Sequence, residues 1–586
     1  MSSNPTQRNR EIPAWLIIAA LAGLALVALN WGERLTPTGT GISWNPMELV
    51  QAAIDKNLAW PTASWFILGG FAALLIVAYV LFTEIWGSSR DEAEKFTPQG
   101  AAITSMMGFT SAWRKARQIY GAQVTKKTAE AFIALAVYAN ASKKTPLYIQ
   151  LEDSMWVYAP ARGGKTSSIV IPMILNAPGP VLATSTKPDV VAWTAIAREK
   201  QGHVFVCDWE NITGWPTRVN WTPIYGCEDE DEALERGKAW ANAAPMEGTK
   251  NGSWFSAKAG TVLGRLLHAA ALEDCTMDDL LMWIFDSHNP EPITILEDHH
   301  KSRAFIQPLR ERTESRAGET EDSIKATLLS LAEPLVTEKV LSQFRFRKEE
   351  AFDINTFLEG PNTLHIVVDG EKSPLGTLST MFADQVYRAA RRKSSQFASG
   401  RLWPVFRMVL DEAPNVAAFS NMSELITDTG GRGIQVIGIS QSFIQNEARW
   451  GKEEAKTIES NASLKLIFPG INSEDLKTYA NDMGVRNKAR ISHSSSKSGG
   501  SRTTSSEEKA IVRAEELKHL RFGQATAVYR NLPPHVVHTE MVWQRKDHQE
   551  LNEMKEQTLR RCGKIFHEPT QTLAGSDPAE TLGGAR

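Results

Sequence analysis

The stretch that most constrains the fold lies between residues 155 and 175, where a run of small residues separates two apolar segments. The run is APARGGKT, at residues 159–166; it follows MWVY and precedes SSIVIPMIL. Small residues let consecutive backbone N–H groups converge on phosphate oxygens, and a following helix points the positive end of its dipole at them. A chance Gly-Gly-Lys-Thr in a surface loop is the alternative. A strand, such a loop and a helix in this order favour a phosphate-binding loop in an α/β fold.

Each position of this loop has an expected part in holding a nucleoside triphosphate. Lys165 is placed to reach the β- and γ-phosphates, and the Thr166 hydroxyl is placed to bind Mg²⁺. Ala159 stands where such loops carry a glycine, which suits the turn only if its φ is negative. Pro172 lies inside the expected helix and should bend or shorten it. The predicted ligands are ATP and Mg²⁺, and the residues expected around the phosphates are Ala159, Pro160, Ala161, Arg162, Gly163, Gly164, Lys165, Thr166 and Ser167.

A second apolar segment carries the acidic half of the same site. The sequence FRMVLDE, at residues 406–412, is an expected strand that ends in two carboxylates. Asp411 is expected in the magnesium shell, and Glu412 is expected to polarise the attacking water as a general base. A pair of acids at a strand end is by itself often only a helix cap. Beside a phosphate loop, however, it is the partner that ATP hydrolysis requires.

Two further candidates flank the segment IQVIGIS at residues 434–440, which is a third expected strand of the site. Gln441 follows this segment, at the end where a polar side chain can sense the γ-phosphate; an ordinary amide at a strand end is the alternative. Arg432 precedes it, within Gly-Gly-Arg-Gly. We expect Arg432 either to reach a neighbouring subunit as an arginine finger or to be a solvated loop cation.

Two uncharged apolar runs near the amino terminus, at residues 14–31 and 63–82, predict membrane spans. A helix needs about 20 apolar residues to cross the hydrocarbon core, which the second run meets comfortably and the first only narrowly. Tryptophans at the ends of the runs and basic residues outside them favour a two-pass anchor with the bulk of the chain in the cytoplasm. A cleaved signal peptide is the alternative for the first run.

Composition narrows the class of protein further. The 586 residues correspond to about four domain lengths of roughly 150 residues each. Lys and Arg number 64 against 67 Asp and Glu, which excludes a chain that is basic throughout, so any contact with nucleic acid must be local. The four cysteines form neither a disulfide framework nor a zinc-binding spacing. No Ser-His-Asp or Cys-His arrangement indicates covalent catalysis.

After about residue 145, short apolar runs alternate with longer amphipathic stretches, which is typical of a parallel sheet covered by helices. Strands are expected to begin near residues 155, 181, 203, 363, 406, 434, 464 and 526. Thr276-x-x-Asp279 predicts a capping box within a helical region. Residues 488–508, rich in Ser and Gly, predict a surface loop. The expected domains are a membrane anchor at 1–90, a nucleotide-binding domain at 91–229 and 346–544, an all-α insertion at 230–345, and a partly disordered, initially helical tail at 545–586.

Three charged clusters have plainer interpretations. Asp298-His299-His300 lacks the i, i+4 spacing of a zinc motif and indicates a solvated helix face. The basic cluster at residues 388–393 suits the negative end of a helix dipole. The basic residues between 114 and 117 suit anionic lipid headgroups near the anchor. Contact of either basic cluster with DNA phosphates is the less favoured interpretation.

Taken in order, these motifs resemble those of the type IV secretion coupling proteins, the TraG/TraD-like conjugative DNA-transfer ATPases. The resemblance covers most of residues 1–540. Two features depart from the family pattern: Ala159, and STKPD at residues 185–189 in place of an acidic D-x-K-G-E stretch. The second variant is closer to actinobacterial members of the family. It leaves the role of Lys187 open. The resemblance rests on the paired apolar runs, APARGGKTSSIVIPMIL, LDEAPN, and GRGIQVIGISQS followed by EEAKTIESNASLKLIF and SEDLKTYANDMG.

The resemblance implies a RecA-like motor domain with an all-α insertion, working as a homo-hexameric ring under the bacterial inner membrane. Its implied activity is ATP hydrolysis that passes relaxase-bound single-stranded DNA, or secreted proteins, to a type IV secretion channel. Two other functions stay open. An FtsK- or HerA-like double-stranded DNA pump would be expected to carry further membrane helices and a winged-helix module. A receptor that binds ATP and cargo but hardly hydrolyses would most simply lack Glu412.

Overall fold

The computed structural model describes most of the chain after residue 102 and parts of the chain before it. The chain divides into two compact units, residues 1–97 and 98–586. In the first unit, residues 27–35 and 62–70 are helical, and the predicted spans 14–31 and 63–82 lie largely outside the described residues. No helix among the described residues has the length and hydropathy that a bilayer crossing requires. The described residues are 27–38, 60–70, 103–126, 134–139, 144–243, 252–314, 319–370, 375–482, 484–496, 499–510 and 512–564, with single positions at 45, 48, 51, 54 and 373.

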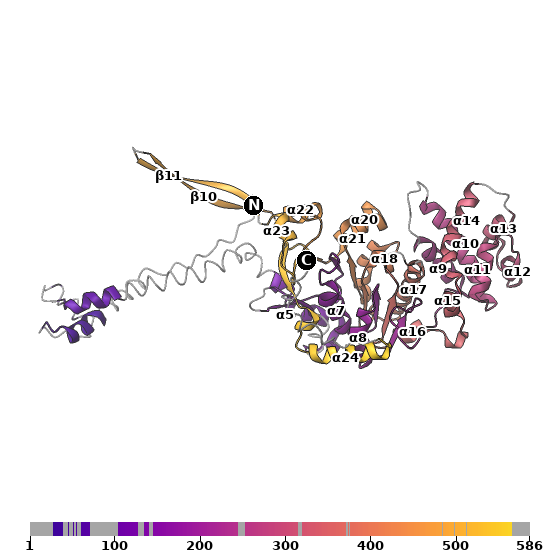
Figure 1. The fold of residues 1–586 in the computed structure, drawn as a ribbon, viewed down its shortest axis with the longest axis horizontal. Helices are drawn as coiled ribbons and strands as arrows, with labels where there is room; N and C mark the ends of the chain where they lie inside the picture. Colours follow the sequence, from indigo (N-terminus) through magenta and orange to yellow (C-terminus); the bar gives the residue numbers. More distant parts are fainter. Residues whose placement is uncertain are drawn as a thin grey trace, which may run out of the picture. The chain divides into compact units, whose positions relative to one another are not determined.

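The second unit is built on a mixed sheet, whose described part has eleven strands (Figure 1). The strand order is β2-β1-β13-β12-β9-β3-β8-β7-β4-β6-β5. The strand that leads into the phosphate loop, β3, therefore lies in the middle of the sheet. The strands are β1 (Ala134–Tyr138), β2 (Pro146–Tyr148), β3 (Met155–Tyr158), β4 (Val181–Ser185), β5 (Val204–Cys207), β6 (Thr363–Val367), β7 (Phe406–Leu410), β8 (Ile434–Ser440), β9 (Leu464–Ile467), β12 (Gln524–Tyr529) and β13 (His535–Thr539).

The seven strands from β9 across to β5 are parallel. They are short and apolar because helices cover both faces, and every residue of β3, β4, β6, β7 and β8 is buried. The sequence predicted these seven strands and β12 to within two residues at either end. The expectation of a parallel sheet is wrong beyond β9, where β12, β13, β1 and β2 pair antiparallel. The sequence did not predict strands β1, β2 and β13; β1 pairs with β13, which lies far away in the chain.

Helices pack on the sheet and close the main core, whose buried members include Met155, Ile169, Val409 and Ile437. Helix α24 packs along α8, so the chain after β13 returns to the sheet domain (Figure 1). Leu551 on α24 contacts Ile171 and Val542, and burying such a side chain contributes roughly 1.5–3 kcal/mol. The expected helical start of the tail is thus present. These helices are α5 (Phe109–Tyr120), α7 (Ile171–Leu175), α8 (Asp189–Glu199), α16 (Ile354–Phe357), α17 (Gly376–Ser394), α18 (Ala413–Val416), α19 (Met422–Asp428), α20 (Phe443–Trp450), α21 (Lys452–Asn461), α22 (Ser473–Asp482), α23 (Ala514–Lys518) and α24 (His548–Arg561).

Between β5 and β6, the described residues form helices and no strand. Figure 1 shows these helices gathered on one side of the sheet. The backbones of α9 and α10 touch, because a Cβ added to Gly237 would lie 2.3 Å from the backbone nitrogen of Gly264. The predicted capping box is present: Thr276 and Asp279 exchange hydrogen bonds at the start of α11. The helices are α9 (Glu230–Ala243), α10 (Gly252–Leu272), α11 (Met277–Phe285), α12 (Glu291–Asp298), α13 (Arg303–Glu314), α14 (Glu319–Ala332) and α15 (Glu338–Leu341).

The expected surface loop at residues 488–508 is instead part of a β-hairpin. Strands β10 (Val485–Ser496) and β11 (Gly499–Ala510) pair antiparallel as a separate two-stranded sheet, in register from Val485 opposite Ala510 to Ser496 opposite Gly499. The polar composition indicates that this segment has no buried core of its own. A two-stranded ribbon needs no core of its own, however, because each strand satisfies the backbone groups of the other.

Candidate nucleotide site

The phosphate loop leaves β3 at the carboxyl-terminal edge of the parallel strands. Ala159 is fully buried and does not have a positive φ, which meets the condition for an alanine at this position. Gly164 has a φ of +90°, a conformation that L side chains rarely adopt. The N–H of Gly163 donates to Pro160 O at 3.1 Å and closes a turn. The loop therefore depends on glycine at 164 but not at 159.

The helix that follows the loop begins with a π-helical turn, η2 (Thr166–Val170), and continues as α7. The N–H of Ile171 donates to Thr166 O, five residues earlier. Pro172 comes next and has no N–H, and α7 ends at Leu175, so the helix is short as Pro172 predicted. The hydroxyl of Thr166 makes no hydrogen bond to any residue that the structure describes. That oxygen is therefore available to a ligand at the helix start.

Lys165 and the two carboxylates meet although they are far apart in the sequence. Its Nζ lies 2.8 Å from Asp411 Oδ1 and 3.4 Å from Glu412 Oε1. All three side chains are at most 14% exposed. Burial raises the pKa of Asp411 above its ordinary value, and the neighbouring Lys165 ammonium opposes that shift. A buried carboxylate beside a mobile ammonium suits a site that receives both a cation and phosphate oxygens.

Glu412 is held in an uncommon backbone conformation, with a φ of 54° and a ψ of 48°. Left-handed geometry costs a residue with a Cβ on the order of 1 kcal/mol, so it persists only where the surroundings enforce it. Here the Asn415 side chain donates to Glu412 Oε2 at 3.3 Å, and the Asn415 N–H donates to Glu412 O at 2.8 Å. The left-handed turn directs the carboxylate of Glu412 toward Lys165, because the backbone changes direction at the end of β7.

Gln441 lies at the same edge of the sheet. Its Nε2 donates to Glu412 Oε1 at 3.5 Å, and its backbone N–H donates to Gln445 Oε1 at 2.9 Å. Gln445 in turn donates to Asn415 Oδ1 at 3.5 Å, so an amide network surrounds the acid. The structure thus brings Lys165, Asp411, Glu412 and Gln441 together, and the catalytic roles assigned to them stay predictions.

Arg432 lies elsewhere. It precedes β8, whereas Gln441 follows it, and β8 runs parallel to β3 and β7. Seven residues of strand span about 23 Å, so Arg432 lies at the opposite edge of the sheet from Lys165. Its guanidinium donates to Asp428 at 2.5 Å. Within its own chain, Arg432 therefore does not act on this site.

Sequence reasoning missed two apolar residues that border the phosphate loop. A Cβ added to Gly164 would lie 3.2 Å from the ring of Phe522 and 3.0 Å from Cε of Met541. Met541 is buried, but Phe522 is 63% exposed. Asn415 and Gln445 were also missed as supports of Glu412. Phe522 lies more than 350 residues after the loop in the sequence, so only the antiparallel end of the sheet brings it there.

The residues present fit a magnesium nucleotide. Mg²⁺ is held in such sites by one or two protein oxygens together with phosphates and water, and the Thr166 hydroxyl and the buried Asp411 carboxylate offer two. No group of three or more His, Cys, Asp or Glu side chains among the described residues suggests another metal site. His299 contacts Glu273 at 2.7 Å, as a helix-face residue does. Lys187 is exposed, and its role stays open.

The basic cluster at residues 388–393 is engaged in ion pairs. Arg388 contacts Glu235 and Asp384, and Arg392 contacts Glu232. Arg391 and Lys393 contact Asp428 and Glu359 at 3.7 Å. These contacts favour the plain interpretation of the cluster over a binding surface for nucleic acid.

Known proteins share this organisation. The conjugal transfer protein TraG of Escherichia coli is 24% identical over 354 residues, which cover 54% of this chain and 52% of TraG. The chain thus spans about half the length of the curated relatives it matches. The bacterial conjugative coupling protein TrwBdeltaN70, in its unbound monoclinic form, has a TM-score of 0.50 at 14% identity, covering 70% of this chain and 88% of that chain. The plasmid coupling protein TrwB in complex with ADP and Mg²⁺ gives 0.49 at 14% identity, with 68% and 89% covered.

The TrwBdeltaN70 likeness shows that the fold is shared. The sequence model of a single family, described as type IV secretory system conjugative DNA transfer, matches residues 103–562, which is well over half of the chain. The match includes the phosphate loop, both carboxylates, the insertion and α24. It confirms the resemblance to the type IV secretion coupling proteins. The chain therefore belongs to the type IV secretory system conjugative DNA-transfer family.

Proposed function

We propose that this chain is a membrane-anchored ATPase that drives DNA, or protein cargo, into a type IV secretion channel. The observation that carries the proposal is the convergence of Lys165, Asp411, Glu412 and Gln441 on the carboxyl-terminal edge of the sheet, in a chain of the conjugative DNA-transfer family. The apolar runs at 14–31 and 63–82 support a two-pass anchor in the bacterial inner membrane, with the sheet domain in the cytoplasm.

We assign each of these groups a step in the proposed ATP hydrolysis. Backbone N–H groups of the loop and the Lys165 ammonium bind the phosphates and offset their charge. Thr166 and Asp411 would hold Mg²⁺, which would supply positive charge to offset that of the phosphates. Glu412 accepts the proton of the attacking water. Gln441, hydrogen-bonded to Glu412, reports whether the γ-phosphate is present.

The opposite position of Arg432 supports a ring of several copies. A guanidinium that cannot reach the phosphates of its own chain can serve only those of a neighbour, as arginine fingers do. A homo-hexamer with one nucleotide site at each subunit boundary satisfies this condition. The relaxase-bound single strand is the cargo we propose from the family.

The experiment is steady-state ATP hydrolysis by the full chain in a neutral detergent, across protein concentrations and with or without single-stranded DNA. The proposal predicts activity that rises more than linearly with protein concentration, rises again with DNA, and disappears in Glu412→Gln. Stimulation by duplex DNA alone would favour a double-stranded DNA pump. Tight ATP binding with turnover no faster than that of Glu412→Gln would favour a receptor that binds ATP and cargo without hydrolysis.

A further inference from the structure

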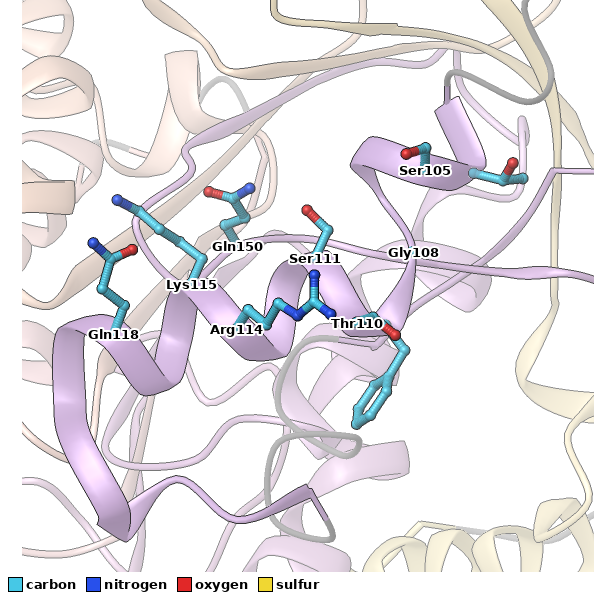
Figure 2. Close-up of a pocket in the computed structure, with 10 residues that line it drawn as sticks. Ser105, Gly108, Thr110, Ser111, Arg114, Lys115, Gln118 and Gln150 are labelled. Carbon is cyan, nitrogen blue, oxygen red and sulfur yellow. The ribbon is translucent and has the colours of Figure 1, made fainter.

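A second site candidate lies at the amino-terminal edge of the sheet, away from the phosphate loop. Helix α5 packs there through Ala112 and Ala116 against Leu151 and Val405, which precede β3 and β7. A cavity of about 630 Å³ opens beside this helix (Figure 2). The volume is several times that of a phosphate group, so the cavity has room for a phosphate and for the group that carries it. Nothing in the nucleotide site uses this cavity.

The lining of the cavity is made of hydrogen-bond donors. Ser105, Thr110 and Ser111 contribute hydroxyls, and Arg114 and Lys115 contribute positive charge. Figure 2 shows Thr110, Ser111 and Arg114 on the first turns of α5, whose N–H groups also open onto this end of the helix. None of the lining residues is acidic. The cavity is therefore suited to an anion.

Gln150 adds a donor at the wall of the cavity. The residue is only 8% exposed and lines the cavity. Its Oε1 accepts from Arg530 at 2.9 Å, which fixes the orientation of the amide. Its NH₂ makes no hydrogen bond to any residue that the structure describes. That group is therefore available to an anionic oxygen in the cavity.

Arg114 is the cation that is free to bind such an anion. Lys115 lies 3.4 Å from Glu152, whose other oxygen contacts Arg401 at 2.5 Å. Arg114 is exposed and forms no ion pair within the described part of the chain. Its planar guanidinium can donate to two oxygens of one phosphate at once.

The surroundings of α5 indicate what carries the phosphate. Arg117 and Lys126 lie over the ring of Trp113, at 5.6 and 5.1 Å from its centroid. Trp113 is half-buried and its Nε1 is enclosed. The two cations over its ring add positive charge beside the cavity, which suits anionic lipid headgroups. In the sequence, Thr104 comes 22 residues after the uncharged run 63–82, for which a membrane span is proposed.

We propose that this cavity binds the phosphodiester of an anionic membrane lipid, with Arg114 and the Gln150 amide as the principal donors. The proposal rests on the membrane location proposed above, but it does not involve the nucleotide site. Because the two sites lie at opposite edges of the sheet, loss of one leaves the geometry of the other unchanged.

The test is isothermal titration of the full chain in a neutral detergent. The probes are the short-chain lipids dihexanoyl-phosphatidylglycerol and dihexanoyl-phosphatidylcholine, inorganic phosphate and an oligothymidylate. We expect saturable binding of phosphatidylglycerol and at least tenfold weaker binding of the other three. Arg114→Gln should weaken phosphatidylglycerol binding about tenfold, the typical effect of one charge-assisted hydrogen bond. Arg117→Gln, one turn away and outside the cavity, should change it less than twofold.

Several outcomes would overturn the proposal. Equal binding of phosphatidylcholine would mean that the cavity does not select an anionic lipid. Equal losses in the two arginine variants would mean that no phosphate is held at Arg114. Inorganic phosphate that binds as tightly as phosphatidylglycerol would assign the site to a free anion, and tighter oligothymidylate binding would assign it to nucleic acid. ATP turnover of Arg114→Gln, measured in parallel, separates the two proposals. Unchanged turnover with weaker lipid binding supports the lipid site alone, and lost turnover in both arginine variants would point to damage beyond this cavity.

Discussion

The two edges of the parallel strands are built on different principles. At the carboxyl-terminal edge, polar side chains from three strands contact one another, and the cation Lys165 is paired with two acids. At the amino-terminal edge, Arg432 is paired with Asp428, the last residue of α19, and Arg114 faces a polar cavity. Parallel strands deliver their following loops to one edge, so chemistry collects there. The other edge is left for attachment to membranes or neighbouring subunits.

The edges also differ in backbone strain. Arg162, Gly164 and Glu412 all have a positive φ within or beside the nucleotide site. At the other edge, the positive φ before β8 belongs to Gly433, at +71°, and the glycines there relieve crowding: a Cβ on Gly430 would lie 2.2 Å from Glu152 O. Strain at the first edge aims functional groups, whereas small residues at the second permit close packing.

The largest effect is expected from Lys165→Ala. Removal of the ammonium takes away a phosphate contact and leaves Asp411 buried without its partner, so ATP turnover should fall about a thousandfold. Steady-state hydrolysis measures this. Lys187→Ala, at an exposed lysine after β4 whose role stays open, shows whether the loss is specific to Lys165. If both variants lose activity equally, ATP turnover depends on the net positive charge at this edge and not on the position of Lys165.

A mixing experiment tests whether the amino-terminal edge serves a neighbour. Arg432→Ala alone should lower turnover about a hundredfold while ATP affinity stays unchanged. Mixed with Lys165→Ala, it should regain part of the activity, because some boundaries then combine an intact loop with an intact arginine. Arg391→Ala, which removes another cation near Asp428, is the control. No recovery in the mixture would remove the basis for a shared site.

Phe522→Ala tests whether the nucleotide site at the carboxyl-terminal edge extends to the exposed ring of Phe522. The exposed ring beside Gly164 is placed to stack on the base of a bound nucleotide, so its loss should weaken ATP binding about tenfold. Phe522→Trp should retain binding, and Trp543→Ala, at another exposed aromatic, should have no effect. Fluorescent ATP-analogue titration gives the affinities. Equal affinity for Phe522→Ala and wild type would place the base elsewhere.

The smallest effect is expected on the free energy of unfolding, from the left-handed backbone conformation of Glu412. Glu412→Gly and Glu412→Ala should both abolish hydrolysis, but the glycine variant should be more stable than the alanine variant by about 1 kcal/mol, because glycine adopts the left-handed conformation without cost. Urea unfolding monitored by circular dichroism compares the two. Equal stabilities would show that the turn after β7 relaxes once the carboxylate is removed.

The sequence was most informative where local rules decide the structure. The phosphate loop, the parallel strands and the Thr276 capping box each depend on neighbours in the chain, and each was predicted. The pairing of β1 with β13 joins residues far apart in the chain, and so does the contact of Phe522 with the loop. The hairpin shows a third case, because composition alone cannot separate a polar loop from a ribbon whose backbone pairs with itself. The position of Arg432, by contrast, follows from strand direction once the sheet is known.

Helix α20 joins the nucleotide site to the insertion. It begins two residues after Gln441, with Ser442 as its cap, and Arg449 near its other end donates to Ala243 O, the last residue of α9. Eight helical residues form a rod about 12 Å long. Helix α20 thus connects Gln441, which contacts Glu412, with α9 of the insertion. A rotation of α20 by a few degrees would shift α9 by about an ångström. The length of a single helix therefore sets how far a change at the nucleotide site moves the insertion.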